Sequence, residues 1–545
     1  MSLDSSRFRT KLCQLTKSLQ NVFSLKNAKW VIWCLIALSL IIIDSKLILR
    51  GSGYYPKPNI EQILIFSYLI IIFSSSKKIF WFLLFPFILI YALYTPIGLT
   101  FGGPTYQHIS SLVATDTNEA KEFLLQIPYK NYFYAISIII IIVAYRIITV
   151  KYRINLFKNK FILSIATLYL LFNMSPFDFF RKTYKETLHV KKELDTLNKL
   201  SLKSEWGDAY LENSKYDDYI LIIGESARRD YHHAYGYPIA NTPFMSSSKG
   251  VFIDGLESAG TYTIASLKLM LTKPNASKWQ ENYSLNLIDL IKSVGIKTYW
   301  LSNQGYLGEW DTPISSIGNK SDYKLFIKKG KYDEQNTDDS ELLPHLKNII
   351  NKDSKEKRFI VIHLYGSHPN ACDRIKGKEM ILKDKEFDKK YFYLNCYITS
   401  IKETDKLIEN IYNLMNDVKK EKKRTFSMIY FSDHGQCHFS RNPPNITISQ
   451  ACTSKLHNDV PLFKISSDDI DRKEYKVFKS GLNFTDGIAN WIGITNSKLN
   501  KNIDLFSDQP DSGMVAQRTC RFENHRPDGT YRAAFHLEIY LVSRH

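Results

Sequence analysis

Residues 425–435, TFSMIYFSDHG, join a short apolar run directly to a group of polar residues. The run is rich in aromatic and apolar side chains and is too short for a typical helix, so it predicts a buried strand. Ser432, Asp433, His434 and Gly435 follow where that strand ends. Polar groups at the carboxyl end of a buried strand are typical of an α/β fold, which binds its ligands along one edge of a parallel sheet.

The same arrangement occurs twice earlier in the chain. The run at 219–223 precedes Gly224-Glu225-Ser226, and the run at 358–364 precedes Tyr365-Gly366-Ser367-His368. Short apolar runs and longer amphipathic stretches alternate through this region, which predicts a mostly parallel central sheet with flanking helices. The other expected strands are 297–301 and 460–465, and the expected helices are 286–294, 340–350 and 390–415.

Four polar residues at the expected strand ends predict a metal site. The strand ends bring Glu225, His368, Asp433 and His434 to one edge, and His457 precedes the last expected strand. Alone, a histidine at a strand end is more often structural than a ligand, and an aspartate there is often a helix cap. Their convergence favours a metal, and carboxylate oxygens with imidazole nitrogens suit zinc, with manganese as the alternative.

A reacting group is offered by residues 257–266, ESAGTYTIAS, which precede a helix-like run. Backbone N–H groups at a helix start favour anions, and a metal-bound threonine oxygen can become a nucleophile. An ordinary Ser/Thr helix cap explains the same residues equally well.

The first third of the chain contains five stretches apolar enough to be membrane spans. Lys and Arg concentrate before the first stretch and in the second-to-third and fourth-to-fifth loops, which predicts a cytoplasmic N-terminus. Five crossings then place everything after Phe180 outside the inner membrane, in the periplasm of a bacterium with two membranes. The expected spans are 30–49, 60–73, 79–99, 132–150 and 161–180.

Charge and cysteine content narrow the partners. The formal net charge is +18, and no basic run is interleaved with aromatics as in a nucleic-acid motif. We therefore expect contact with membrane lipids and not with nucleic acid. The seven cysteines include no C-x-x-C pair, which argues against a zinc ribbon. Export would allow disulfides between Cys372 and Cys396 and between Cys437 and Cys452.

Four regions are expected along the chain. A five-helix transmembrane bundle (1–180) is followed by a connecting helix or linker (181–218) and a catalytic domain (219–505). The last region (506–545) is atypical, because from Asp511 onward it contains arginine but no lysine. We assign no function to it.

Four motifs in this order resemble those of bacterial phosphoethanolamine transferases, which belong to the alkaline phosphatase/sulfatase superfamily. The motifs are GESARRD (224–230), SAGTYTIAS (258–266), YGSHP (365–369) and FSDHG (431–435), and the resemblance extends over about residues 30–494. It implies an alkaline-phosphatase-like fold for the soluble domain and zinc as the metal.

The resemblance also implies roles for individual residues. Thr263 would be the nucleophile and, with Glu225, Asp433 and His434, a zinc ligand. His368 and His457 would hold the substrate phosphate or a second zinc ion. Thr261 is expected to face the phosphate.

The implied reaction takes phosphoethanolamine from phosphatidylethanolamine and passes it, through an adduct on Thr263, to lipopolysaccharide. Lipid A, a core heptose, Kdo and a periplasmic glucan remain open as acceptors, and we expect a monomer. Many members carry cysteines where this chain has Ala259 and Leu269. In this respect it is more similar to the subgroup that acts on the lipopolysaccharide core.

Two alternatives belong to other functional classes. A phosphoglycerol transferase of envelope polymers would share the bundle and the threonine nucleophile but would favour manganese and another donor. A catalytically decayed envelope-binding protein is the second alternative, and the intact Glu225, Thr263, Asp433 and His434 argue against it. A sulfatase would need a C/S-x-P-x-R motif, which the sequence lacks.

Overall fold

The structure is a computed structural model, which forms two compact units: residues 1–105 with 127–187, and residues 106–126 with 188–545. Each unit is described by itself below. The residues that the structure describes are 25–52, 58, 60–104, 109, 117–125, 127–154, 177–199, 203–304, 312–328, 337–383, 391–441, 445–449 and 455–511.

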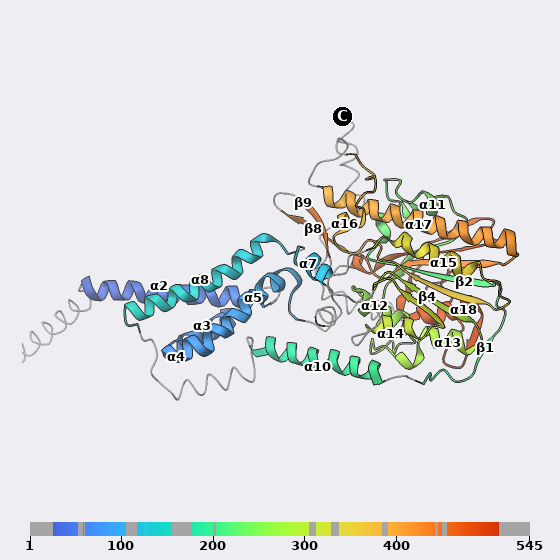
Figure 1. Ribbon diagram of the computed structural model, residues 1–545. Coiled ribbons are helices and arrows are strands. Elements are labelled where there is room, and N and C mark those ends of the chain that lie inside the picture. The colour runs from blue at the N-terminus through green and yellow to red at the C-terminus, as the bar shows by residue number, and fades with distance from the viewer. Residues whose placement is uncertain are drawn as a thin grey trace, which may run out of the picture. The chain divides into compact units, whose positions relative to one another are not determined.

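The first unit is helical (Figure 1). Its helix α2 contacts α3, α5 and α8, and the short α4 and the π-helical turn η1 continue directly into α5. Among the described residues, three stretches are long and apolar enough to cross a membrane, namely Lys29–Gly51, Lys77–Phe101 and Tyr129–Lys151. The helices are α2 Leu25–Gly51, α3 Ile60–Phe73, α4 Lys77–Ile79, η1 Phe80–Leu84, α5 Phe85–Phe101 and α8 Tyr129–Lys151.

Large apolar side chains on these helices point outward. Phe82 is 83% exposed, Leu93 69% and Phe133 68%. Such a surface is costly in water and is typical of helices that face lipid. Of the five expected spans, three are therefore found as long apolar helices. The second forms the 14-residue helix α3, and residues 161–176 of the fifth lie outside the described part of the chain.

The described residues of the second unit form a mixed sheet of nine strands. Eight follow the order β11-β3-β10-β7-β2-β6-β4-β5, and β12 pairs with β3. All pairings are parallel except those of β10, which runs antiparallel to both β3 and β7. The predicted mostly parallel sheet is thus confirmed, with one reversed strand. The strands are β2 Asp218–Gly224, β3 Gly250–Glu257, β4 Lys297–Ser302, β5 Tyr323–Phe326, β6 Arg358–His363, β7 Phe426–Ser432, β10 Asp459–Ser466, β11 Arg472–Tyr475 and β12 Lys479–Ser480.

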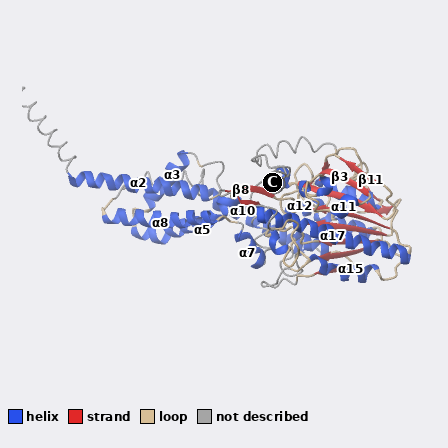
Figure 2. Cartoon of the chain, turned by 90° about the horizontal axis from the view of Figure 1, so that it is seen from above, coloured by secondary structure: helices blue, strands red, loops and turns tan. Residues whose placement is uncertain are grey.

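Helices cover both faces of this sheet (Figures 1 and 2). One apolar core lies between the sheet and α11, α15 and α17, and the other between the sheet and α12, α13, α14 and α18. Because both faces are covered, every residue of β2 is buried, as its continuous apolar sequence predicts. The helices are α11 Pro243–Ser247, α12 Thr263–Met270, α13 Leu287–Ser293, α14 Pro313–Asn319, α15 Leu342–Ile350, α17 Phe392–Lys422 and α18 Phe484–Ile492.

Shorter elements complete this unit. The two-stranded sheets pair β1 (Ala209–Leu211) with β13 (Ile494–Asn496), and β8 (Cys437–Arg441) with β9 (Asn445–Ser449). Helix α7 covers Thr117–Leu125 and α16 covers Ala371–Arg374. The expected tail begins inside the fold, because Phe506 packs in the core and Asp511 accepts a hydrogen bond from the Ser480 amide. Residues 512–545 lie outside the described part of the chain.

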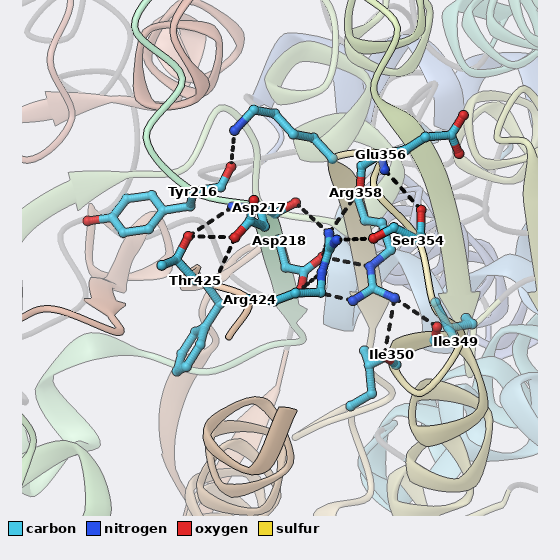
Figure 3. A network of polar contacts seen from close by, with 12 residues as sticks. Tyr216, Asp217, Asp218, Ile349, Ile350, Ser354, Glu356, Arg358, Arg424 and Thr425 are labelled. Carbon is cyan, nitrogen blue, oxygen red and sulfur yellow. Dashed lines mark hydrogen bonds and ion pairs between the residues drawn. The ribbon is translucent and has the colours of Figure 1, made fainter. Parts of the chain in front are cut away.

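A buried ion cluster joins the amino ends of three central strands (Figure 3). Asp218, the first residue of β2, accepts hydrogen bonds through both carboxylate oxygens from Arg358 (2.6 and 2.9 Å) and from Arg424 (3.0 and 2.8 Å). Arg358 begins β6, and Arg424 lies just before β7. Because the carboxylate of Asp218 compensates two cations, this cluster fixes the alignment of β2, β6 and β7 at the edge opposite the site.

Helix α10 (Phe177–Lys199) leads from the first unit into the second. In its second half, Glu193 is buried, lies 3.3 Å from the ammonium of Lys268 and accepts a 2.5 Å hydrogen bond from Tyr283. Lys268 lies on α12 and also pairs with Glu281 at 3.3 Å. Burial raises the pKa of Glu193, and the neighbouring Lys268 opposes that shift. The end of α10 is thus fastened to α12.

Candidate active site

Strand register places two carboxylates side by side. Gly224 at the end of β2 pairs with Ser432 at the end of β7, so Glu225 and Asp433 are the next residues on adjacent parallel strands. Both side chains are buried. The sequence predicts this juxtaposition, because parallel strands bring their carboxyl ends to one edge.

Ser226 reinforces the pair through a backbone conformation that is rare for a residue with a side chain. Its φ is 58°, in the left-handed region, at a cost of about 1–3 kcal/mol. In this conformation its amide donates to Asp433 Oδ1 at 3.0 Å and its hydroxyl donates to Glu225 Oε1 at 2.5 Å. One strained residue therefore holds an oxygen of each carboxylate.

Thr263 is the first residue of α12 and lies against this pair. Its hydroxyl donates to Glu225 Oε2 at 2.9 Å and is 3.5 Å from His434 Nε2. The preceding loop needs Gly260, because a Cβ there would come within 2.8 Å of the Ala265 backbone. The hydroxyl oxygen thus lies at the amino end of an eight-residue helix, where backbone N–H groups favour an anion.

His434 is oriented by its own backbone. Its Nδ1 is 2.7 Å from the carbonyl oxygen of Gly435, so in the neutral ring Nδ1 carries the hydrogen and Nε2 has a free lone pair. Nε2 lies 3.3 Å from Glu225 Oε1 and 3.5 Å from Asp433 Oδ2. A histidine that donates from one nitrogen to a carbonyl and presents the other is typical of a metal ligand.

Three of these residues fit a single metal ion. Glu225, Asp433 and His434 offer ligand atoms that all lie within 4.8 Å of one another, and the Thr263 hydroxyl adjoins them. Buried Asp433 Oδ2 accepts no hydrogen bond from any residue in the described ranges, as expected of an oxygen reserved for a ligand. This oxygen and nitrogen donor set suits zinc or manganese.

The electrostatics of the pair also favour a cation. Burial and the adjacent Glu225 carboxylate raise the pKa of Asp433 well above its ordinary value. Burial disfavours the charge on His434, yet the Asp433 and Glu225 carboxylates outweigh it and raise the pKa of His434 to about 9. A positive charge between the two carboxylates is therefore strongly stabilised, whether it is a proton on His434 or a metal ion.

The other three predicted residues are His457, His368 and Thr261. The His457 ring is buried, 5.8 Å from the His434 ring and 6.4 Å from that of Tyr262, measured between centroids. His457 reaches this edge because β10 runs antiparallel, so its start lies beside the end of β7. His368 stacks on Tyr365 at 4.5 Å. Burial would raise the pKa of Glu225, but His434 and, to a smaller extent, His368 hold it well below its ordinary value. Thr261 is half-buried, two residues before Thr263.

Sequence reasoning missed Gln304. Its amide nitrogen donates to Glu225 Oε2 at 2.9 Å and to the Leu364 carbonyl at 2.6 Å, so it fastens Glu225 to the end of β6. The available signal was its position, because Gln304 follows β4 at the same sheet edge as the other site residues.

The first expected disulfide is present, between Cys372 of α16 and Cys396 of α17. It ties the segment after His368 to the helix that covers one face of the sheet. Cys452, of the second expected pair, lies outside the described residues. His363 lies inside β6, buried beside Ser302, and burial lowers its pKa to about 4.

Comparisons with known proteins agree with this architecture. The sequence profile of the sulfatase family matches residues 217–494. A putative phosphoethanolamine transferase of Haemophilus influenzae is 49% identical over 417 residues, which cover 76% of this chain and 86% of that protein. Phosphoethanolamine transferase OpgE of Escherichia coli is 30% identical and covers 77% of this chain and 81% of its own length.

A solved structure has the same fold over most of the chain. Lipooligosaccharide phosphoethanolamine transferase A (EptA) of Neisseria meningitidis, an integral membrane protein, superposes with a TM-score of 0.55 at 14% identity. The superposition covers 87% of this chain and 97% of that structure.

Proposed function

Because this chain belongs to the phosphoethanolamine transferases of the alkaline phosphatase/sulfatase superfamily, we propose that it transfers phosphoethanolamine from phosphatidylethanolamine to lipopolysaccharide through an adduct on Thr263. The main support is the position of the Thr263 hydroxyl. It lies at the start of helix α12 and is 2.9 Å from the buried carboxylate of Glu225. A nucleophilic hydroxyl for phosphoryl transfer needs such a base beside it and anion-stabilising dipoles around it.

The metal in this proposal is zinc, held by Glu225, Asp433, His434 and the Thr263 oxygen. When bound, zinc supplies Lewis-acid stabilisation of the threonine alkoxide and of the phosphoryl oxygens. Manganese uses similar ligands, and emission spectroscopy of the purified protein distinguishes the two metals.

In the first step, Thr263 Oγ1 attacks the donor phosphorus. The new oxygen–phosphorus bond forms as the bond to the glycerol oxygen breaks, and diacylglycerol leaves after that oxygen takes a proton. Glu225 Oε2 already accepts the hydrogen bond of the Thr263 hydroxyl and is placed to receive its proton. We assign His368, His457 and Thr261 to the phosphate oxygens, because the two histidines lie close to this centre and Thr261 is two residues before Thr263.

In the second step, an acceptor hydroxyl or phosphate oxygen attacks the phosphorus of the adduct. Its bond to phosphorus forms as the bond to Thr263 Oγ1 breaks, and the threonine regains a proton. The acceptor thereby carries phosphoethanolamine and the enzyme returns to its starting state.

The membrane unit suits a donor with two acyl chains, which stays in the bilayer. We propose that the chain is a multi-pass protein of the bacterial inner membrane, with a cytoplasmic N-terminus and the catalytic domain in the periplasm. The distribution of Lys and Arg among the apolar stretches supports this orientation.

Mass spectrometry of the adduct tests the proposed function. The purified zinc-loaded protein is incubated with labelled phosphatidylethanolamine and digested, and we expect phosphoethanolamine on the peptide that contains Thr263. In Thr263→Ala the adduct should disappear while zinc binding is largely kept, because three protein ligands remain. Thr261→Ala tests which threonine of the loop carries the adduct. Any adduct on this variant should still be found on Thr263.

Two results would contradict the proposal. A phosphoglycerol adduct from phosphatidylglycerol, with none from phosphatidylethanolamine, would favour the phosphoglycerol transferase. Normal transfer by Thr263→Ala would show that another residue is the nucleophile.

A further inference from the structure

A cavity of about 410 Å³, lined mainly by polar and charged residues, lies between α17, α16 and the loop that follows β6. This volume falls in the range of small-molecule sites, roughly 300–1,000 Å³. Tyr365 and Gly366 form part of its wall, and His368 follows them in the chain. The cavity therefore borders the loop that carries a candidate phosphate-binding residue.

The cavity wall also touches the metal-site carboxylate. A Cβ on Gly366 would come within 3.2 Å of Glu225 Cβ, so the wall is in contact with Glu225. Glu225 in turn accepts the hydrogen bond of the Thr263 hydroxyl. The cavity wall thus adjoins a residue that contacts the proposed nucleophile.

The walls of the cavity are held in place. Asp339 accepts hydrogen bonds from the amides of Tyr365 and Gly366, both at 2.8 Å. The Cys372–Cys396 disulfide joins α16 to α17, and both helices line the cavity. A site that is ordered before binding loses less entropy when its ligand arrives.

The lining indicates the chemistry of the ligand. Among the lining residues that the structure describes, Leu407 is the only Leu, Ile, Val, Phe, Met or Trp, so the cavity does not suit acyl chains. Its cations are balanced by carboxylates: Lys378 lies 3.1 Å from Asp338 and 3.7 Å from Glu403. The rest of the lining includes the hydroxyls of Thr337, Ser340, Ser400 and Thr404.

Such a surface offers many donors and acceptors without an excess of either charge. A phosphate-rich ligand would favour an excess of cations, whereas an uncharged polyhydroxyl ligand needs donors and acceptors in similar numbers. We propose that this cavity binds an uncharged sugar of the acceptor saccharide. This inference rests on the proposed function, whose second step needs a bound acceptor saccharide.

The two half-reactions separate this inference from the proposed function. Adduct formation on Thr263 needs only the donor, whereas discharge of the adduct needs the acceptor. A blocked cavity should therefore leave the first half-reaction intact and slow the second.

The test uses the full-length zinc-loaded protein in detergent and replaces Glu403 of α17. Glu403→Trp fills the cavity with an indole ring and removes a carboxylate that lines it. Glu421→Trp is the matched control, because Glu421 is exposed on the same helix, about 27 Å further along its axis. The acceptor probe is dephosphorylated core oligosaccharide released from lipopolysaccharide.

We expect Glu403→Trp to form the adduct at the wild-type rate and to discharge it to the oligosaccharide at least ten-fold more slowly. Glu421→Trp should match the wild type in both steps. Wild-type discharge by Glu403→Trp would overturn the inference.

If the wild type forms no adduct, the proposed function fails, and direct binding of the oligosaccharide then decides the inference. Binding to the wild type and to Glu421→Trp, with loss in Glu403→Trp, supports the cavity as a sugar site. Equal binding by all three proteins, or no binding, overturns it. Binding of phosphorylated oligosaccharide alone would show that the ligand class is wrong.

Discussion

Replacing Gln304 with leucine should weaken metal binding without touching a metal ligand. The substitution removes the hydrogen bond from the Gln304 amide to Glu225 Oε2, which is 2.9 Å long and charge-assisted. Bonds to charged groups contribute about 1.5–3 kcal/mol. Because each 1.4 kcal/mol corresponds to about a ten-fold change, we expect zinc affinity to fall by about 10- to 100-fold, the range typical of residues that orient a metal ligand.

Competition with a fluorescent chelator measures this affinity directly. Gln509→Leu is the control, because Gln509 is exposed and the substitution is the same. Gln304→Leu also leaves the Leu364 carbonyl without the amide that donates to it, so the unfolding temperature of the metal-free protein must be recorded alongside. If both variants bind zinc as tightly as the wild type, the argument that Gln304 positions Glu225 is refuted.

Two further predictions concern stability. Asp218→Ala should lower the unfolding free energy by about 3–5 kcal/mol, because it leaves Arg358 and Arg424 buried without their shared carboxylate. Zinc affinity should stay unchanged, since the cluster lies about 20 Å along β2 from the site, and a large affinity loss would contradict this separation. Burial raises the pKa of Asp405 to about 7, although the amides of Phe244 and Met245 oppose the shift. The folded state then binds more protons than the unfolded state, so the unfolding free energy should fall as pH rises from about 4 to about 7. Asp405→Asn should flatten this dependence in denaturant titrations between pH 4 and pH 7, and an unchanged slope would argue against Asp405 as its source.

Sequence patterns predicted the central strands well because burial on both faces gives them uninterrupted apolar runs. The runs at 219–223 and 425–431 correspond to β2 and β7, and their ends supply Glu225, Asp433 and His434. The direction of β10 was not predicted, since an apolar run does not reveal which way a strand points.

Strand β3 escaped prediction because its pattern is broken. Asp254 and Gly255 interrupt the apolar sequence, and Gly255 has a φ of +149° where the Val477 carbonyl approaches closely. Gln304 escaped for another reason, because an amide after a strand has no distinctive signature until its partner is known. The sequence therefore predicts the ionisable residues Glu225, Asp433 and His434 better than the neutral Gln304, which orients Glu225.

The link between Glu193 and Lys268 affects how a water-soluble fragment of this protein would behave. A fragment that begins near residue 200 lacks Glu193 and leaves Lys268 with Glu281 as its remaining acidic partner. Lys268 lies on the helix that starts with Thr263, so the deletion reaches the helix that carries the proposed nucleophile. A fragment that begins at about residue 188 would keep this ion pair and is the better starting point for soluble work on the catalytic domain.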